Sequence, residues 1–302
     1  MGIWKSVSLV DVSHYINFVL INQHFPALPS LEVVDLNLTI GISSLSKSEG
    51  LSLQISIDNS SLSPIIKEIS AKELSIQVRI QDPILWYPRG YGDQHLYQLD
   101  VKLGVGNKFI DSVSKSIGIR HVSLIENTDE DGKGSSFYFV INSVPVFVKG
   151  SNMIPDNVFH HSSQENLELL IHSAVASHQN MIRVWGGGVY PSEYFYELCD
   201  QHGLMIWQEL MFACAMYPRD SDFLQNVQEE VRENLRRISH HASIVIIGGN
   251  NENEIAFSWF DQVETNPALY HVDYAKLYLD TIYPIVQEIC PDRAWVHSSP
   301  SN

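Results

Sequence analysis

The sequence predicts a multidomain chain with an all-β part and an α/β part, in which an immunoglobulin-like β-sandwich is followed by an incomplete (β/α)8 TIM barrel. Its length of 302 residues exceeds that of one ordinary domain. Between about residues 30 and 125, short runs of alternating apolar and polar residues are separated by Ser, Asn, Gly and Pro. After about residue 137, an apolar strand, a polar turn and an amphipathic helix follow one another repeatedly.

The alternating runs predict a sandwich domain over residues 26–120. Residues 51–57 and 74–80 show the alternation clearly, and a period of two with frequent turns indicates an antiparallel sandwich of immunoglobulin size. The preceding residues 1–25 are too few for a domain, although residues 7–12 and 15–21 look like strands. We therefore expect residues 1–25 to be the tail of another, N-terminal domain.

The repeated strand and helix pattern predicts the first part of a barrel over residues 121–302. The expected strands are residues 144–148, 181–185, 204–207, 244–247 and 294–297, and the expected helices are residues 163–177, 192–202, 221–239 and 274–289. Such alternation implies a parallel sheet, and a (β/α) barrel is the leading architecture. The alternative, a doubly wound sheet, has no glycine-rich phosphate loop to support it. Five strands do not close an eight-stranded barrel, so we expect the chain to be truncated.

The composition predicts a folded chain and argues against two kinds of partner. Apolar residues make up 44% of the chain and charged residues 18%, which is unlike a disordered protein. A formal charge of −16 with only 19 Lys and Arg residues argues against nucleic acid as a partner. The sequence contains no apolar stretch of about eighteen residues, so it predicts no membrane span. No secretory leader is visible at the N-terminus.

The cysteines and the glycosylation sequons add little about function. Cys199, Cys214 and Cys290 have no metal-like spacing, and their odd number gives no complete disulfide framework, so we interpret them as buried thiols. The sequons at Asn37 and Asn59 are compatible with a secretory route, although such triplets also arise by chance.

Polar residues that directly follow the expected strands are the candidates for chemistry, because a barrel carries its active site at the carboxyl ends of its strands. These segments are residues 149–155, 183–188, 207–209 and 249–254. In the last segment, Glu252 lies near glycines that let a substrate approach, and glycosidases need a carboxylic acid that protonates a leaving oxygen. The alternative is a polar turn whose Asn and Glu side chains cap the next helix.

Three further residues have both a functional and a structural interpretation. Trp185, followed by three glycines, suits a platform for a sugar ring, or it belongs simply to the core. Arg183 lies inside an expected strand, where its charge must be paired, so it orients a carboxylate or only stabilises the fold. Glu209 is a second carboxylate, a metal ligand or a salt-bridge partner, and we favour a structural role. The histidine pairs 160–161 and 240–241 could suggest a metal, but we favour solvated surface because adjacent side chains face different directions.

At these segments the sequence resembles the β-mannosidases of glycoside hydrolase family 2, and the resemblance covers essentially the whole chain. It is carried by Lys149-Gly150-Ser151-Asn152, Arg183-Val184-Trp185-Gly186-Gly187-Gly188, Glu197-Leu198-Cys199-Asp200, Trp207-Gln208-Glu209, Met211-Phe212-Ala213-Cys214 and Gly249-Asn250-Asn251-Glu252, and upstream by Leu85-Trp86-Tyr87-Pro88-Arg89-Gly90 and Ile117-Gly118-Ile119-Arg120.

The resemblance implies a domain order and a set of site residues. Residues 1–25 would be the end of a jelly-roll domain, residues 26–120 the sandwich, and residues 121–302 the first part of the catalytic barrel, about five strands. Glu252 would be the general acid/base, Asn251 would bond the sugar 2-hydroxyl, and Trp185 would line the mannose site. Arg183 would support the carboxylates, and Asn152 completes the expected substrate-binding set. The nucleophile of the family comes from the seventh strand, so it is unknown in this chain, and no cofactor or metal is expected.

The implied function is that of a retaining exo-β-mannosidase, which removes terminal β-linked mannose from oligosaccharides. We expect this chain alone to be inactive, because the nucleophile is missing. The alternatives are a non-catalytic carbohydrate-binding remnant and another family 2 activity, such as β-galactosidase or β-glucuronidase. By resemblance to animal relatives, the expected location is the lysosome.

Two departures from the family pattern stand near the expected site. Met153 replaces a usual Trp, which is expected to alter packing or the pocket wall. Ile247-Gly248 replaces a usual Trp-Ser or Trp-Cys, which is expected to loosen the support of Glu252.

Overall fold

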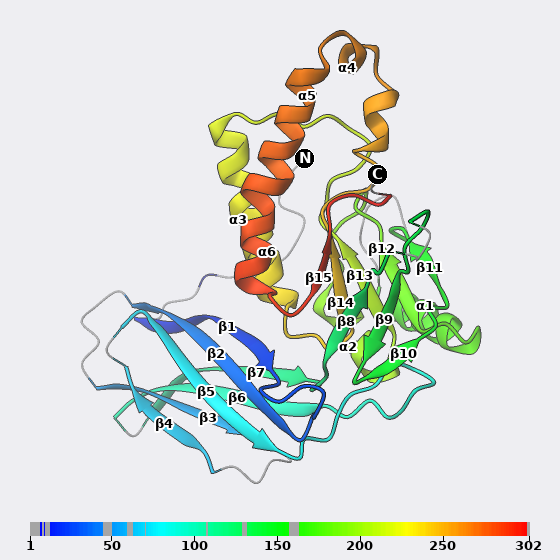
Figure 1. Cartoon of the computed structure of the whole chain (residues 1–302). Helices are drawn as coiled ribbons and strands as arrows, with labels where there is room; N and C mark the ends of the chain where they lie inside the picture. The colour runs from blue at the N-terminus through cyan, green and yellow to red at the C-terminus, as the bar shows by residue number, and fades with distance from the viewer. Residues whose placement is uncertain are drawn as a thin grey trace.

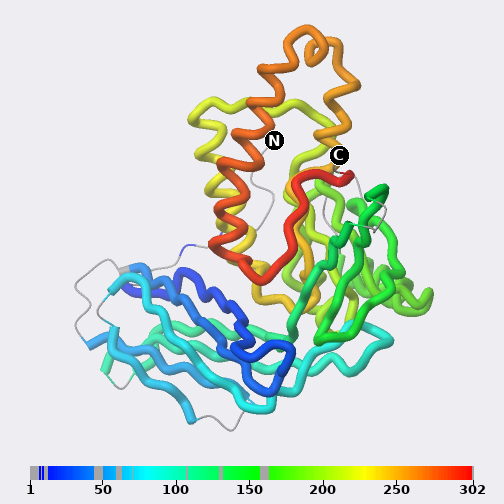
Figure 2. The backbone as a smooth tube through the Cα atoms, viewed as in Figure 1, coloured from blue at the N-terminus to red at the C-terminus, as the bar shows by residue number. Residues whose placement is uncertain are grey.

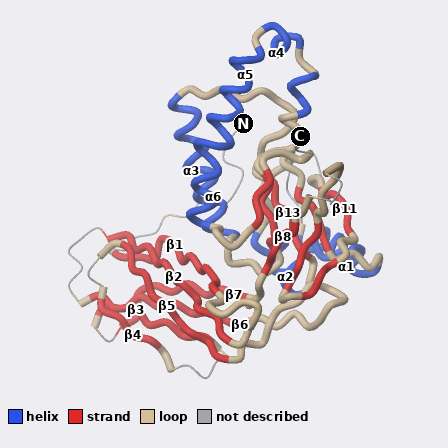
Figure 3. Tube along the Cα trace, in the orientation of Figure 1, coloured by secondary structure: helices blue, strands red, loops and turns tan. Residues whose placement is uncertain are grey.

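The computed structural model describes residues 7, 9, 13–44, 50–58, 63–69, 71–106, 108–128, 132–156 and 163–300. It has two main parts, a β-sandwich and an α/β unit built on a parallel sheet, and the chain passes from the first to the second (Figure 1). In Figure 3 the sandwich contains only strands and loops, whereas the helices belong to the second part. Most of the strand expected over residues 7–12 lies outside the described residues, as do His160, His161 and Asn59.

The sandwich consists of two antiparallel sheets. One has the order β1-β2-β5 and the other β4-β3-β6-β7. The strands are β1 (His14–His24), β2 (Val33–Ser44), β3 (Leu51–Ile57), β4 (Ile65–Glu68), β5 (Glu73–Gln81), β6 (Tyr97–Val105) and β7 (Lys108–Ile117). In β3 every second side chain is buried, as the alternation predicts. The inner faces of both sheets form one apolar core, which includes Leu36, Leu38, Ile40, Leu53, Ile55 and Leu99.

Strand β1 is part of this sandwich. It pairs with β2 in antiparallel fashion from His14 opposite Ser44 to His24 opposite Asp35. The expected domain boundary after residue 25 therefore falls beyond a strand that belongs to the first sheet. The same strand also contacts the α/β unit, because the Arg236 guanidinium lies 3.9 Å from the centre of the Phe18 ring.

The strand expected over residues 144–148 is not the first strand of the parallel sheet. Instead, β10 (Val144–Val146) forms an antiparallel sheet with β9 (Tyr138–Ile141) and β8 (Val122–Ile125). Asn142 and Ser143 have φ of 49° and 66°, which is the backbone conformation of a tight two-residue hairpin turn. A short apolar run has the same pattern in either setting, so the sequence did not distinguish them.

The parallel sheet has five strands in sequential order, β11-β12-β13-β14-β15. They are β11 (Gly150–Met153), β12 (Met181–Val184), β13 (Met205–Glu209), β14 (Ile244–Gly248) and β15 (Ala294–Val296). Three crossover helices, α1 (Gln164–Ala176), α2 (Glu193–His202) and α3 (Ser221–Ile238), connect the first four strands. Apart from the first strand, the expected strands and these helices are confirmed to within a few residues.

The helix ends follow the local sequence. The Ser163 side chain accepts a hydrogen bond from the backbone N–H of Asn166, and the Asp220 side chain accepts one from Phe223. Gly203 ends α2 with a φ of 70°, a left-handed conformation that glycine adopts without a steric penalty.

A longer helical excursion than expected separates β14 from β15. It consists of η1 (Ile255–Ser258), α4 (Asp261–Thr265), α5 (Pro267–Tyr274), the π-helical η2 (Ala275–Ile282) and α6 (Tyr283–Ile289). The tube in Figure 2 shows the chain rising to the tip of this excursion and returning to β15. The helix expected over residues 274–289 is confirmed, but helical structure already begins at residue 255. In the described part of the chain, no helix is long and apolar enough to cross a membrane.

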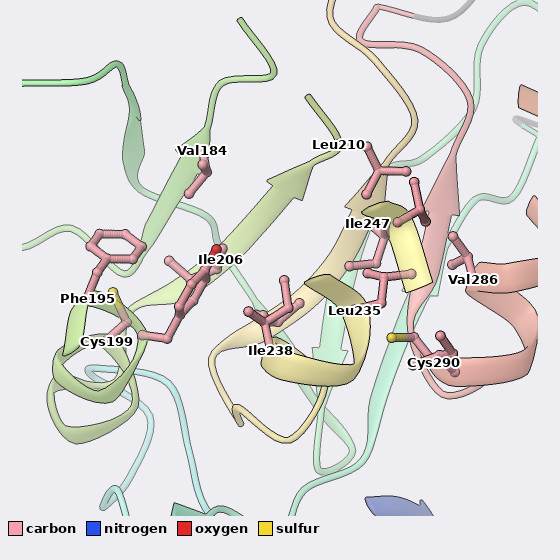
Figure 4. Packing of buried hydrophobic residues seen from close by; sticks show 14 of the residues in the cluster. Val184, Phe195, Cys199, Ile206, Leu210, Leu235, Ile238, Ile247, Val286 and Cys290 are labelled. Carbon is pink, nitrogen blue, oxygen red and sulfur yellow. The ribbon is translucent and has the colours of Figure 1, made fainter. Parts of the chain in front are cut away.

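A large apolar core lies between the parallel sheet and its helices. Figure 4 shows Val184, Ile206 and Ile247 from the strands facing side chains from α2, α3 and α6. Cys199 and Cys290 are among these buried side chains, as we expected for them, whereas Cys214 is only half-buried.

Buried polar contacts join the sandwich to the α/β unit. The indole N–H of Trp86 donates to the backbone oxygen of Asp200 at 2.8 Å. Arg120 is 2% exposed, and its guanidinium donates to the backbone oxygens of Ala242 at 2.7 Å and Ile244 at 2.9 Å. Burial lowers the pKa of Arg120 to about 9. These contacts fix the start of β14 against the segment that leaves the sandwich.

Candidate active site

Arg183 brings together residues from four successive strands and the loops that follow them. Its guanidinium donates to the Asn152 side chain on β11 at 3.0 Å and to the Glu209 carboxylate on β13 at 2.7 Å. It also donates to the side-chain oxygen of Asn251, after β14, at 2.7 Å. The parallel register explains part of this arrangement, because Asn152 is opposite Arg183 in the sheet. The structure therefore gathers these candidates at the carboxyl ends of the strands, as the sequence predicts.

Glu209 is fully buried and has both carboxylate oxygens occupied. Oε1 accepts hydrogen bonds from Nε and Nη2 of Arg183, and Oε2 accepts one from the backbone N–H of Gly186 at 2.7 Å. Burial raises the pKa of Glu209, and the Arg183 charge and the Gly186 N–H partly oppose that rise. Among the three interpretations of Glu209, this geometry matches that of a salt-bridge partner.

Glycine is required at position 186 by the close approach of two backbones. A Cβ atom added there would lie 2.6 Å from the carbonyl oxygen of Leu210 and 2.8 Å from that of Phe212. The same approach lets the Gly186 N–H reach the Glu209 carboxylate. Gly186 thus has a structural function in the close approach of these two backbone segments.

Glu252 lies just beyond β14, half-buried, with a φ of 63°. A non-glycine residue in this left-handed region is uncommon and costs about 1 kcal/mol or more, which is a feature of functional sites. Its Oε2 atom lies 3.4 Å from the Cys214 sulfur and 3.4 Å from the side-chain nitrogen of Asn251. Its backbone N–H donates to Ser299 at 3.3 Å.

The helix-capping alternative for Glu252 does not match the structure. The polar turn is capped by Asn250, whose side-chain oxygen accepts a hydrogen bond from the backbone N–H of Asn253 at 3.0 Å. Asn250 also donates to the backbone oxygen of His297 at 2.8 Å, and Ser298 donates to it at 2.7 Å. The Glu252 side chain points instead toward Asn251 and Cys214.

The half-buried ring of Trp185 lies over Gly187. A Cβ atom at Gly187 would come within 2.1 Å of that ring, so a larger residue there would displace it. The backbone N–H of Trp185 donates to the carbonyl of Met153 at 3.1 Å. Met153, where the family usually has Trp, packs against the large core of the α/β unit.

Gly248, in the second departure from the family pattern, lies against Trp207 and Glu209. A Cβ atom at Gly248 would lie 3.0 Å from the indole nitrogen of Trp207 and 3.0 Å from Cγ of Glu209. Trp207 in turn stacks on Phe137 with ring centres 5.9 Å apart. The small residue therefore leaves room for the Trp207 ring beside Glu209.

Cys214 is a site residue that the sequence did not reveal. We expected only a buried thiol, but its sulfur lies 3.2 Å from the Asn251 side-chain nitrogen and 3.4 Å from Glu252. Its φ of 53° is left-handed, and nothing in the spacing of the cysteines signals this position.

The expectation that His240 and His241 lie on a solvated surface is wrong. Both are buried, at 7% and 1% exposure, because His240 contacts Lys115 of the sandwich and His241 packs against α2. His241 Nδ1 lies 2.6 Å from Asp200, and its Nε2 lies 3.1 Å from Glu193. His240 Nδ1 lies 3.1 Å from the Lys115 ammonium of the sandwich. Glu193, His240 and His241 are close enough to hold a metal ion, but these ring nitrogens already have protein partners.

Comparisons with known proteins agree with the resemblance of the motifs. A family model described as glycosyl hydrolases family 2 matches residues 28–120. The β-mannosidase of Bos taurus is 37% identical over 100% of this chain and 35% of its own length. A probable β-mannosidase of Caenorhabditis elegans is 40% identical over 73% of this chain and 25% of its own length. The chain thus spans about a third of the curated relatives that match all of it.

Solved structures give the same picture. The crystal structure of the β-D-mannosidase from Dictyoglomus thermophilum aligns with a TM-score of 0.84 and 32% identity, and covers 95% of this chain and 35% of that one. A putative β-galactosidase from Bacteroides fragilis aligns with a TM-score of 0.73 over 95% of this chain and 40% of that one, at 19% identity. At that identity the likeness concerns the fold alone.

Proposed function

Since the chain belongs to glycoside hydrolase family 2 and is related to its β-mannosidases, we propose that it is part of a retaining exo-β-mannosidase acting on terminal β-linked mannose of oligosaccharides. The observation that carries the proposal is the convergence of Arg183, Asn251 and Glu252 at the carboxyl ends of the parallel strands β12 and β14. The same position is where barrel enzymes carry their active sites.

We propose that the parallel sheet is the first part of a (β/α)8 barrel. Each strand pairs with the one before it, all in parallel, and no reversal of order occurs among the five. A doubly wound sheet has such a reversal, at which its ligand binds. The sequential strand order favours the barrel. We also propose the domain order that the sequence predicts, in which the end of a jelly-roll domain is followed by the sandwich and then by the first part of the barrel.

Glu252 would act as the general acid, protonating the leaving oxygen, and then as the base that activates water. Asn251, held through its oxygen by Arg183, would donate from its nitrogen to the sugar 2-hydroxyl. In a pyranoside, the carbon that bears this hydroxyl is bonded to the anomeric carbon, so its donor belongs beside the acid. The 3.4 Å between Asn251 and Glu252 fits that requirement.

Trp185 and Asn152 would complete the walls of the mannose site. The half-buried Trp185 ring offers an apolar face, and Asn152 is held beside Arg183 by a hydrogen bond of 3.0 Å. The chemistry assigned to these residues is acid/base catalysis and hydrogen bonding, for which the proposal needs no cofactor.

A retaining enzyme needs a second carboxylate about 5 to 5.5 Å from the first. Glu209 is unsuited, because it is fully buried and both of its oxygens accept hydrogen bonds. Glu254 accepts a hydrogen bond from the Tyr274 hydroxyl at 2.6 Å and lies beyond the turn. We therefore propose that the nucleophile comes from a segment outside this chain and that the chain alone does not turn over substrate.

A chimaera tests the proposal. The chain would replace the corresponding third of the bovine β-mannosidase, and hydrolysis of 4-nitrophenyl β-mannoside would be measured. We expect activity in the chimaera and a loss of about 100-fold or more in kcat with Glu252→Gln, because proton transfer contributes about that factor. Glu254→Gln is the matched control and should retain most of the activity.

The outcome also discriminates among the alternatives. Unchanged activity of the Glu252→Gln chimaera would refute the acid/base assignment. Binding of mannose without hydrolysis in the folded chimaera would favour a carbohydrate-binding remnant. Faster hydrolysis of 4-nitrophenyl β-galactoside or β-glucuronide would point to another family 2 activity.

A lysosomal location is part of the proposal and rests on the resemblance to animal relatives. Glycosylation requires an exposed asparagine, and Asn37 of the first sequon is exposed on β2. Its side chain accepts a hydrogen bond from Gln77 at 3.1 Å. An oligosaccharide on Asn37, detected as a mass lost on enzymatic deglycosylation after expression in animal cells, would support the secretory route.

A further inference from the structure

Cys214 is tied to the loop of Glu252 by its backbone as well as by its sulfur. The Cys214 N–H donates to the carbonyl of Asn251 at 2.9 Å, and the Asn251 N–H donates to the carbonyl of Phe212 at 2.9 Å. These bonds form an isolated parallel bridge between the loop after β13 and the loop after β14. The position of the thiol relative to Glu252 is therefore set by main-chain contacts.

The side chains extend this link into a chain of hydrogen bonds. Arg183 donates to the oxygen of Asn251 at 2.7 Å, and the nitrogen of Asn251 donates to the Cys214 sulfur at 3.2 Å. The Cys214 thiol in turn donates to the Glu252 carboxylate at 3.4 Å. Both Cys214 and Glu252 have left-handed backbones, with φ of 53° and 63°. Each left-handed backbone conformation raises the free energy of the folded chain. Both occur here at the point where the two side chains meet.

We propose that Cys214 is a positioning residue for Glu252. The Cys214 thiol holds the Glu252 carboxylate at the angle needed for proton transfer. This inference rests on the proposed function, because it assigns Cys214 a part in the work of the acid/base. A thiol is a weak hydrogen-bond donor. It therefore orients the carboxylate without strongly favouring the ionised form, which a hydroxyl donor would do.

The reactivity of the thiol tests the contact without any need for hydrolysis. Burial raises the pKa of the Cys214 thiol, and its hydrogen bond to Glu252 raises it further. Removing the carboxylate charge with Glu252→Gln should lower that pKa, because a neighbouring negative charge favours the neutral thiol. The thiolate fraction then rises by more than the nucleophilicity of the thiolate falls, so alkylation by iodoacetamide at pH 8 should become about three times faster.

The measurement would use the whole 302-residue chain. Peptide mass spectrometry would follow alkylation at Cys214, with the buried Cys199 and Cys290 as slow internal references. Glu254→Gln is the matched control, because it removes a nearby carboxylate that is bonded to Tyr274. Circular dichroism would establish that each variant is folded. Equal rates in the wild-type and Glu252→Gln chains, or the same acceleration by Glu254→Gln, would overturn the proposal.

A second measurement separates positioning from a merely structural role. In the chimaera, Cys214→Ser supplies a stronger donor to the ionised Glu252, so the alkaline limb of the pH–kcat profile should move to lower pH. Cys214→Val removes the donor, so the limb should move to higher pH and kcat should fall. Movement of the alkaline limb in the same direction in both variants, or no movement in either, would also overturn the proposal. An inactive chimaera refutes the proposed function, whereas the alkylation result still decides whether the contact exists.

Discussion

At the scale of single residues, Arg183 determines the arrangement of the site. It is 20% exposed, and it donates to a carboxylate that is fully buried and to the amide oxygens of two asparagines. A buried carboxylate without its partner is costly, whereas a pair on the surface contributes little. The stability of the site therefore depends on this one guanidinium.

Arg183→Met is expected to lower the free energy of unfolding by about 2 to 3 kcal/mol, because it leaves Glu209 buried without its counter-charge. Urea denaturation of the purified chain measures the change. Arg232→Met is the control, since Arg232 and its partner Glu288 are 33% and 54% exposed. We expect about 0.5 kcal/mol or less there. Equal losses in the two variants would contradict the argument.

The sequence revealed some of these residues better than others. Arg183 could be chosen as a candidate because a charge inside a strand must be paired. The pattern left Glu252 open between an acid and a helix cap, and only the resemblance to the family assigned its role. The sequence could not identify Glu209 as the partner of Arg183, because that pairing depends on the register of β13 against β12. Cys214 was missed because its role depends on a left-handed backbone and a bridge between two loops. Local patterns do not contain either of these.

At the scale of elements, local signals determined the helices, and long-range pairing determined the sheets. Ser163, Asp220 and Gly203 mark helix ends by side-chain or backbone chemistry that acts within one turn. The assignment of β10 needed a partner strand, and its run Val144–Val146 is compatible with both a hairpin and a parallel sheet. The first strand of the parallel sheet was misplaced for that reason.

The cap of α3 gives a prediction with a built-in control. Asp220→Ala should destabilise the chain by about 1 kcal/mol, because it removes the side-chain acceptor for the Phe223 N–H. Ser192 occupies the corresponding position of α2 but makes no side-chain cap bond. Ser192→Ala should therefore cost at most a few tenths of a kcal/mol in urea denaturation. A larger loss from Ser192→Ala than from Asp220→Ala would contradict this explanation.

At the scale of the whole molecule, the sandwich and the α/β unit meet through buried charged groups. Lys115 of the sandwich contacts His240, and His241 lies between Asp200 and Glu193 of the α/β unit. Arg237 also binds Glu193, at 3.0 Å. The burial of both histidines could not be predicted, because it depends on tertiary contacts, with the sandwich for His240 and with α2 for His241.

This cluster predicts a pH dependence of stability. Burial lowers the pKa of His241, but Asp200 and Glu193 raise it more, to about 9. The stabilisation is therefore complete below the unfolded pKa of about 6.5 and is lost as pH rises through 9, by an amount on the order of 3 kcal/mol. The measured quantity is the difference in free energy of unfolding between the wild-type and His241→Gln chains.

That difference should shrink between pH 6.5 and pH 9. Ser192→Ala removes no titratable group and is the control, for which the difference should stay constant. A constant difference for His241→Gln across the same range would show that the imidazole carries no excess proton in the folded chain.

The sequential order of the parallel sheet also has a consequence for synthesis on the ribosome. Because each strand pairs with the one made just before it, a docking edge already exists when the next strand leaves the exit tunnel. Arg183 and Glu209 would thus be paired before residue 252 has been translated. If the strands dock in this order, Glu252 would enter surroundings in which Arg183 and Glu209 are already paired.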